Sequence, residues 1–243
     1  MSAPSTLAAG NGNENSSDIA QVGRNGDVVL VVGSGREKIQ VSSHFLMFIS
    51  PVFRAMFEAP MREGEALRNK ADDSPFEIIL SDDNPRAMRL ALRVLYGSDA
   101  GTNGLPSEEV KNIAILADKY AMVERFKFAG LCWIRFLLDK DRSPGMCWNL
   151  LVAAYMLKLD NHFFSVSQAM IYNRGSLLKF AAELPQQDLG MRLGMAIEEL
   201  RAARNDQNQH VGLCLDCFLH ATESFTKKRD GCKFPERHLK NLP

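Results

Sequence analysis

The residues best suited to chemistry are cysteines and histidines near the end of the chain. Cys214 and Cys217 form a C-x-x-C pair, and the thiols and imidazoles around it are His210, His220, Cys232 and His238. Two thiolates at this spacing, joined by two further thiolate or imidazole ligands, can hold a zinc ion in tetrahedral coordination. A C-x-x-C pair can also act as a redox centre when a helix N-terminus stabilises its thiolate.

The apolar pattern around this pair favours packing over chemistry. Residues 188–225 follow helical spacing, which would place Cys214 and Cys217 on one face with Val211 and Phe218. Cysteine behaves as a small apolar side chain in such a position. We therefore predict core cysteines, with no bound metal and no cofactor. Structural zinc and thiol redox chemistry remain the alternatives, although the pair lacks the strand-to-helix setting of a redox motif.

Other groups that resemble reactive motifs have simpler explanations. His44 lies among apolar neighbours, and Gly33-Ser34-Gly35 lacks the later glycine and lysine of a phosphate-binding loop. The adjacent carboxylates Asp82 and Asp83 precede a proline that can begin a helix, so helix capping explains them. We predict that the chain is not an enzyme.

The elements that position these residues begin near the front of the chain. Residues 28–32 form an uninterrupted aliphatic run, which is typical of a strand buried on both faces. Glycines at 33 and 35 favour a turn, and residues 36–41 alternate as a returning strand. Two short apolar helices follow, one beginning at Ser42 or Ser43 and one at Pro51.

This ordered set resembles the first half of a BTB/POZ domain. The residues that carry the resemblance are Asp27-Val28-Val29-Leu30, His44-Phe45-Leu46 and Ser50-Pro51-Val52-Phe53-Arg54-Ala55-Met56-Phe57. A third strand at 76–80, a helix at 87–96 ending in Gly97, and the segment Ala117-Asp118-Lys119-Tyr120 agree with it. The resemblance covers 26–138 and implies an α+β protein–protein interaction module without catalytic residues.

The resemblance also implies two kinds of binding residue. In this family the first helix and its neighbours form a self-complementary surface, so we expect a homodimer interface that includes Phe45, Met47, Phe48 and Phe53. Members that recruit a cullin scaffold for ubiquitin ligation carry a hydrophobic-x-Glu motif after the second helix. Met61-Arg62-Glu63 resembles this motif, with Met61 and Glu63 as the partner-binding residues. A dimerising transcriptional or scaffolding adaptor without ligase recruitment is the alternative.

Three regions follow from these patterns. Residues 1–25 are rich in small polar residues and predict a flexible segment. The resemblance implies that residues 26–138 form an α+β BTB/POZ domain around a three-stranded sheet. Residues 139–243 show helical spacing throughout and predict an all-α extension, as in BTB proteins of the fungal type.

The amino-acid composition limits the classes of binding partner and the cellular compartments that we expect. Lys+Arg and Asp+Glu both count 29, and a chain without a basic surplus is not expected to bind nucleic acid directly. The sequence shows neither a secretory signal nor an apolar run long enough for a membrane span, and five cysteines are too few for a disulfide framework. We expect a cytoplasmic or nuclear protein. The basic run at 227–229 is either a solvated segment or a nuclear-targeting or acidic-partner patch.

Overall fold

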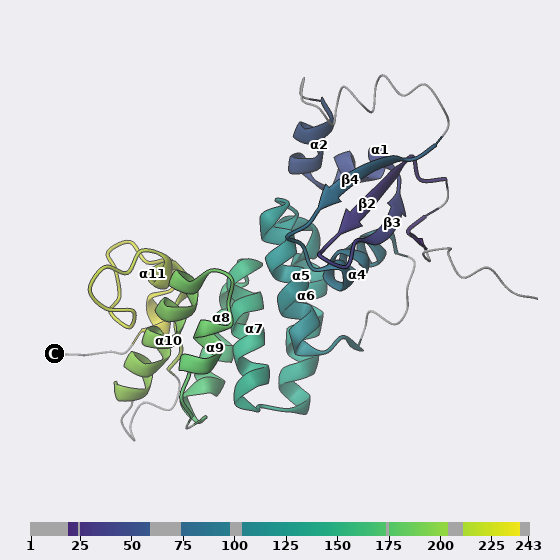
Figure 1. Cartoon of the computed structure of the whole chain (residues 1–243). Coiled ribbons are helices and arrows are strands. Elements are labelled where there is room, and N and C mark those ends of the chain that lie inside the picture. The colour runs from purple at the N-terminus through teal and green to yellow at the C-terminus, as the bar shows by residue number, and fades with distance from the viewer. Residues whose placement is uncertain are drawn as a thin grey trace, which may run out of the picture.

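A four-stranded sheet in the order β1-β3-β2-β4 lies at one end of the molecule (Figure 1). β2 and β3 form an antiparallel hairpin that pairs Leu30 with Ile39, and β4 runs parallel to β2 and pairs Ile78 with Leu30. All five residues of β2 are buried, as the uninterrupted aliphatic run predicted. The strands are β1 (Ala20–Gln21), β2 (Val28–Val32), β3 (Glu37–Val41) and β4 (Phe76–Leu80).

The computed structural model describes residues 19–23, 25–58, 74–97, 104–173, 175–203 and 211–238. Within the predicted flexible segment 1–25, β1 corrects the last few residues, because Ala20 and Gln21 pair with β3 and Val22 is buried. Residues 1–18 of that segment lie outside the described residues. A two-residue edge strand is too short to show the period of two that reveals a strand in a sequence. The sheet therefore has one strand more than the three we expected.

Polar side chains form hydrogen bonds at the N-termini of two helices in the sheet-containing part. The carboxylate of Asp27, just before β2, accepts hydrogen bonds from the Ser43 backbone N–H (2.7 Å) and hydroxyl (2.6 Å), which ties α1 to the sheet. Asn84 caps α4 through the N–H of Ala87, and Gly97 ends α4 in the left-handed conformation that glycine adopts readily. The helices are α1 (Ser43–Ile49), α2 (Pro51–Glu58), α4 (Pro85–Tyr96), α5 (Ser107–Lys119) and α6 (Val123–Lys140).

A buried polar junction joins these helices. Asp83, predicted as a cap, instead accepts the Tyr120 hydroxyl (2.6 Å) and pairs with Lys119 Nζ (2.7 Å). Ser50 donates to the Tyr120 carbonyl (2.7 Å), and the Tyr120 ring stacks on Phe53 at 4.6 Å. Burial, together with the hydrogen bond to Asp83 and its charge, raises the pKa of Tyr120. The junction therefore holds the end of α5 against α2 and the start of α4.

Helices beyond α6 follow one another away from the sheet (Figure 1). α7 packs on both α5 and α8, and α8 in turn contacts α10 and α11. One continuous apolar core runs from the sheet through these helices, so the extension shares the core of the sheet-containing part. Across the described ranges, none of the helices has the length and apolar character needed to cross a membrane. The helices are α7 (Pro144–Met156), α8 (Asp160–Ile171), α9 (Leu178–Ala182), α10 (Gln187–Ala202), α11 (Leu215–Leu219) and the short 3-10 helix η2 (Pro235–Arg237).

The single helical pattern predicted for 188–225 is wrong. α10 ends at Ala202, α11 is only five residues long, and residues 220–234 contain neither helix nor strand. Val211 and Leu213 are buried in a segment that is neither helix nor strand, where a Cβ on Gly212 would lie 2.5 Å from the Phe164 carbonyl oxygen. Short apolar runs do not distinguish an extended buried segment from a buried helix, which explains the error.

The helix α6 carries apolar residues on two sides but is buried on only one of them. One side is buried through Phe126, Trp133 and Ile134. The other is open, because Phe128 is 78% exposed and Cys132 and Phe136 are exposed as well. Apolar residues on both sides of this helix therefore do not mean that other elements pack against both sides.

Candidate functional site

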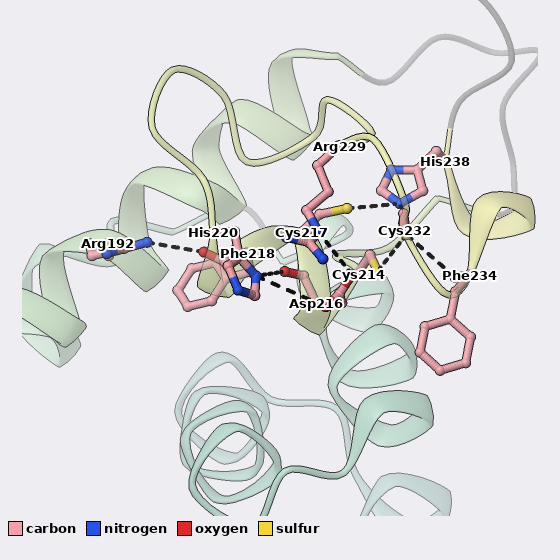
Figure 2. A network of polar contacts seen from close by, with 10 residues as sticks. All are labelled: Arg192, Cys214, Asp216, Cys217, Phe218, His220, Arg229, Cys232, Phe234 and His238. Carbon is pink, nitrogen blue, oxygen red and sulfur yellow. Dashed lines mark hydrogen bonds and ion pairs between the residues drawn. The ribbon is translucent and has the colours of Figure 1, made fainter.

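Four potential metal ligands converge at the end of the helical extension. Cys214 immediately precedes α11, Cys217 lies within it, and Cys232 and His238 come from the segment that follows. Their ligand atoms all lie within 4.8 Å of one another. Figure 2 shows the side chains of Cys217, Cys232 and His238 directed toward a common point beside Cys214.

Individual distances describe a small closed cluster. The sulfurs of Cys214 and Cys232 are 3.7 Å apart. His238 Nε2 lies 3.4 Å from the Cys217 sulfur and 3.3 Å from the Cys232 sulfur. Cys214 and Cys217 are almost fully buried, whereas Cys232 and His238 are half-buried. The cluster therefore lies at the boundary between the core and the terminal segment.

Backbone N–H groups surround the three sulfurs. Cys217 N–H donates to Cys214, Arg229 N–H donates to Cys217, and Phe234 N–H lies 3.4 Å from the Cys232 sulfur. Burial, followed by the neighbouring cysteines, nevertheless raises the pKa of Cys214 to about 12 and raises that of Cys217. As bare side chains Cys214 and Cys217 are therefore thiols at neutral pH, and a positively charged ligand would be needed to hold them as thiolates.

A second layer of contacts orients His238. Its Nδ1 lies 3.4 Å from the Thr226 carbonyl oxygen, which leaves Nε2 facing the sulfurs. Thr226 is itself held by Glu199 of α10, through its N–H (3.2 Å) and its hydroxyl (2.7 Å). Glu199 also accepts from Ser224 and from the Phe225 N–H. Burial alone would raise the pKa of Glu199, but these hydrogen bonds outweigh it and lower the pKa.

We identified all four residues of this cluster from the sequence but predicted the wrong secondary structure around them. Cys214 and Cys217 are buried as predicted, yet they do not share the face of a long helix, because Cys214 has extended backbone. His220 is exposed and turns to the Asp216 carbonyl, so it does not join the cluster. His210 lies outside the described residues. Glu199 went unnoticed, since a lone glutamate in a helical pattern gives no signal.

The second candidate site is the outward face of α1 and α2. Phe48 is 61% exposed and the neighbouring Val52 is also exposed. The Arg125 guanidinium lies 4.5 Å from the Phe48 ring centre and donates to the Phe48 carbonyl (3.0 Å). Phe45 is half-buried against Tyr96, with ring centres 5.1 Å apart, and Met47 is half-buried too. Three of the four predicted interface residues thus keep part of their surface available.

The prediction that Phe53, the fourth of these residues, belongs to the interface has to be corrected. Its side chain is fully buried between the rings of Phe57 and Tyr120, so it supports α2 from inside and has no surface to offer a partner. A short helix that is apolar nearly all round does not reveal from sequence which side faces inward. Val52, which was not predicted as an interface residue, is an exposed apolar side chain of α2. Met61 and Glu63 lie outside the described residues.

The sheet and its helices define the class of protein, a mixed α+β module followed by a mainly helical region. The BTB/POZ domain family model matches residues 19–128. The chain therefore carries a BTB/POZ domain, a module of protein–protein interaction and dimerisation that is typically non-catalytic. The resemblance seen in the sequence and the predicted α+β fold with a helical extension are confirmed. Comparison with curated proteins gives no match.

Proposed function

We propose that this protein is a self-associating adaptor whose BTB/POZ domain pairs with a second copy through the outward face of α1 and α2. The observation that carries the proposal is the exposure of Phe48 and Val52 on these consecutive short helices. Contiguous apolar side chains at a surface favour contact with another polypeptide, which removes them from water. Phe45 and Met47 add partly exposed apolar surface on α1.

The experiment compares the mass of the protein in solution with that of the double variant Phe48→Glu, Val52→Glu, by light scattering or sedimentation. We expect a wild-type dimer. The variant should associate at least about tenfold more weakly, because the carboxylate at position 52 would be buried in the interface without a partner, at a cost of more than about 1.4 kcal/mol. The Arg125 guanidinium beside position 48 can pair with the new carboxylate, which favours retention of the fold.

Met195→Glu provides the matched control. Met195 is 59% exposed on α10, so the change adds a charge at an equally exposed apolar position far along the chain. It should leave the dimer intact. A monomeric wild type across the concentration range, or a double variant that still dimerises with wild-type affinity, contradicts the proposed interface.

A more specific form of the proposal makes the protein a substrate adaptor for a cullin-based ubiquitin ligase. Its basis is Met61-Arg62-Glu63, in which Met61 would fill an apolar groove and Glu63 would fix the register. Met61→Ala with Glu63→Lys should abolish co-purification with a cullin while the BTB dimer persists. Arg62→Ala is the control, because the middle position of the motif accepts any residue. Cullin binding that survives the double change would show that the motif is misassigned.

The alternative is a dimerising transcriptional or scaffolding adaptor that recruits no ligase. Wild-type protein that dimerises through α1 and α2 yet co-purifies with no cullin would favour it. In both forms we propose that the whole chain acts without catalysis and in the cytoplasm or nucleus, where cysteines stay reduced.

A further inference from the structure

We propose that Cys214, Cys217, Cys232 and His238 bind one zinc ion as a structural site of the Cys3His type. Three thiolates and one imidazole are ligands that zinc prefers, and they select it over hard cations such as magnesium and calcium. All four side chains come from one short stretch of chain, and each directs a single ligand atom toward the others. The site is separate from the BTB/POZ surface and does not depend on self-association.

Three of the six distances between ligand atoms are close to the edges of a tetrahedron around zinc, and all six are within 4.8 Å. Bonds of about 2.3 Å to sulfur and 2.0–2.1 Å to nitrogen require S···S edges near 3.8 Å and S···N edges of about 3.6 Å. The Cys214–Cys232 edge is 3.7 Å, and the edges from His238 to Cys217 and Cys232 are 3.4 and 3.3 Å. Side chains that merely pack in a core have no reason to adopt this set of distances.

The surroundings of the ligands point to the same conclusion. Each of the three sulfurs faces one backbone N–H, an arrangement that stabilises thiolates. The second nitrogen of His238 faces the Thr226 carbonyl oxygen, as the outer nitrogen of a metal-bound histidine usually does. These groups provide the outer partners that orient metal ligands, and a cluster of ordinary core cysteines would not require them.

The role of such a site follows from the chain around it. Residues 220–234 contain neither helix nor strand, and none of them is fully buried. A loop of this length seldom keeps one conformation without a specific constraint. Zinc would join this loop and η2 to α11, which packs on α8 through Phe218 and Phe163 with ring centres 5.4 Å apart. Four protein ligands leave no open position, which indicates a structural site.

The first test measures zinc in the purified full-length chain. The protein, fully reduced and given zinc alone, should retain one equivalent after gel filtration, as measured by elemental analysis. Cobalt substituted for zinc should give the absorption of tetrahedral coordination together with thiolate charge transfer. Wild-type protein with free thiols that retains no zinc overturns the proposal, as does a Cys214–Cys232 disulfide that persists under reducing conditions.

The second test removes single ligands. Cys217→Ser and His238→Ala should each weaken zinc binding more than about 100-fold, beyond the effect expected from losing an outer-shell partner. Cys132→Ser and His220→Ala are matched controls, because both residues are exposed and neither belongs to the cluster. They should bind zinc as the wild type does.

A third variant keeps the test valid if a ligand variant unfolds. His238→Cys preserves four ligands and should still bind one zinc, with a cobalt spectrum shifted toward four-thiolate coordination. Zinc binding that is unchanged in both Cys217→Ser and His238→Ala would overturn the assignment. So would loss of zinc from either exposed control.

Discussion

In the BTB/POZ part, large apolar side chains from the sheet and the surrounding helices bury one another, and polar groups serve mainly to join helices. The terminal segment 211–238 differs: its buried apolar residues lie only between Val211 and Phe218. Much of the rest is held by polar contacts, among them those of Glu199, the Arg229–Asp216 ion pair and the cysteine–histidine cluster. The comparison shows two ways in which a segment of the chain can be held in one conformation. Apolar burial tolerates the loss of single polar contacts, whereas a segment held by a few ligands depends on each of them.

The largest effect should come from removing the proposed zinc ion, because structural zinc sites contribute apparent free energies of about 10–16 kcal/mol in isolated peptides. A strong chelator should make 211–238 sensitive to protease while α1 to α8 remain protected. Mass spectrometry of the fragments measures this directly. Equal loss of protection in both regions would contradict the distinction between them, and Cys132→Ser should respond as the wild type does.

A core truncation in the BTB/POZ part should come next. Phe53→Ala removes a fully buried ring from between Phe57 and Tyr120 and should lower the free energy of unfolding by about 3–5 kcal/mol. Urea unfolding measures the change, with zinc affinity unchanged. Phe48→Ala is the control, since the same truncation at an exposed position should cost about 1 kcal/mol or less, mainly its contact with Arg125. Similar losses for both variants would show that Phe53 is not a core residue.

The polar junction should give a smaller effect. Tyr120→Phe keeps the ring that stacks on Phe53 but leaves the buried Asp83 carboxylate without the hydroxyl, at a cost of about 1–3 kcal/mol. Because folding raises the pKa of Tyr120, its contribution is complete below pH 10 and is lost as pH rises above that value. Tyr96→Phe, at a side chain that is 44% exposed, should change stability by less than about 0.5 kcal/mol.

The smallest predicted effect concerns Asp27. Burial opposes its ionisation, but the hydrogen bonds from Ser43 and the charge of His44 outweigh burial and lower its pKa below 3.8. Its contribution is therefore present above pH 3.8 and is lost as pH falls through the lowered pKa. Asp27→Asn should cost about 1 kcal/mol, as for other helix caps, and should flatten the acid side of the stability profile. A profile as steep as that of the wild type would contradict this role.

Local patterns identified several elements correctly. The aliphatic run of β2, the strand at 76–80 and the helix that begins at Pro51 all lie where the sequence placed them. Each has a strong local cause, either continuous β-branched residues or a proline at the first helical position. The helix predicted over 188–225 is wrong because apolar residues continue into 211–213, a segment that is neither helix nor strand and that lies against α8 at Gly212.

By itself the sequence determined the order of the front elements, their resemblance to a BTB/POZ domain, and the residue types able to hold zinc. Each of these properties depends on residues that are close together in the sequence, so the local sequence is enough to predict it. Tertiary structure decided which aromatic side chain of α1 and α2 faces outward, and it brought Cys232 and His238 to Cys214 and Cys217. Both outcomes depend on which surfaces far along the chain cover a given residue, and no local pattern carries that information.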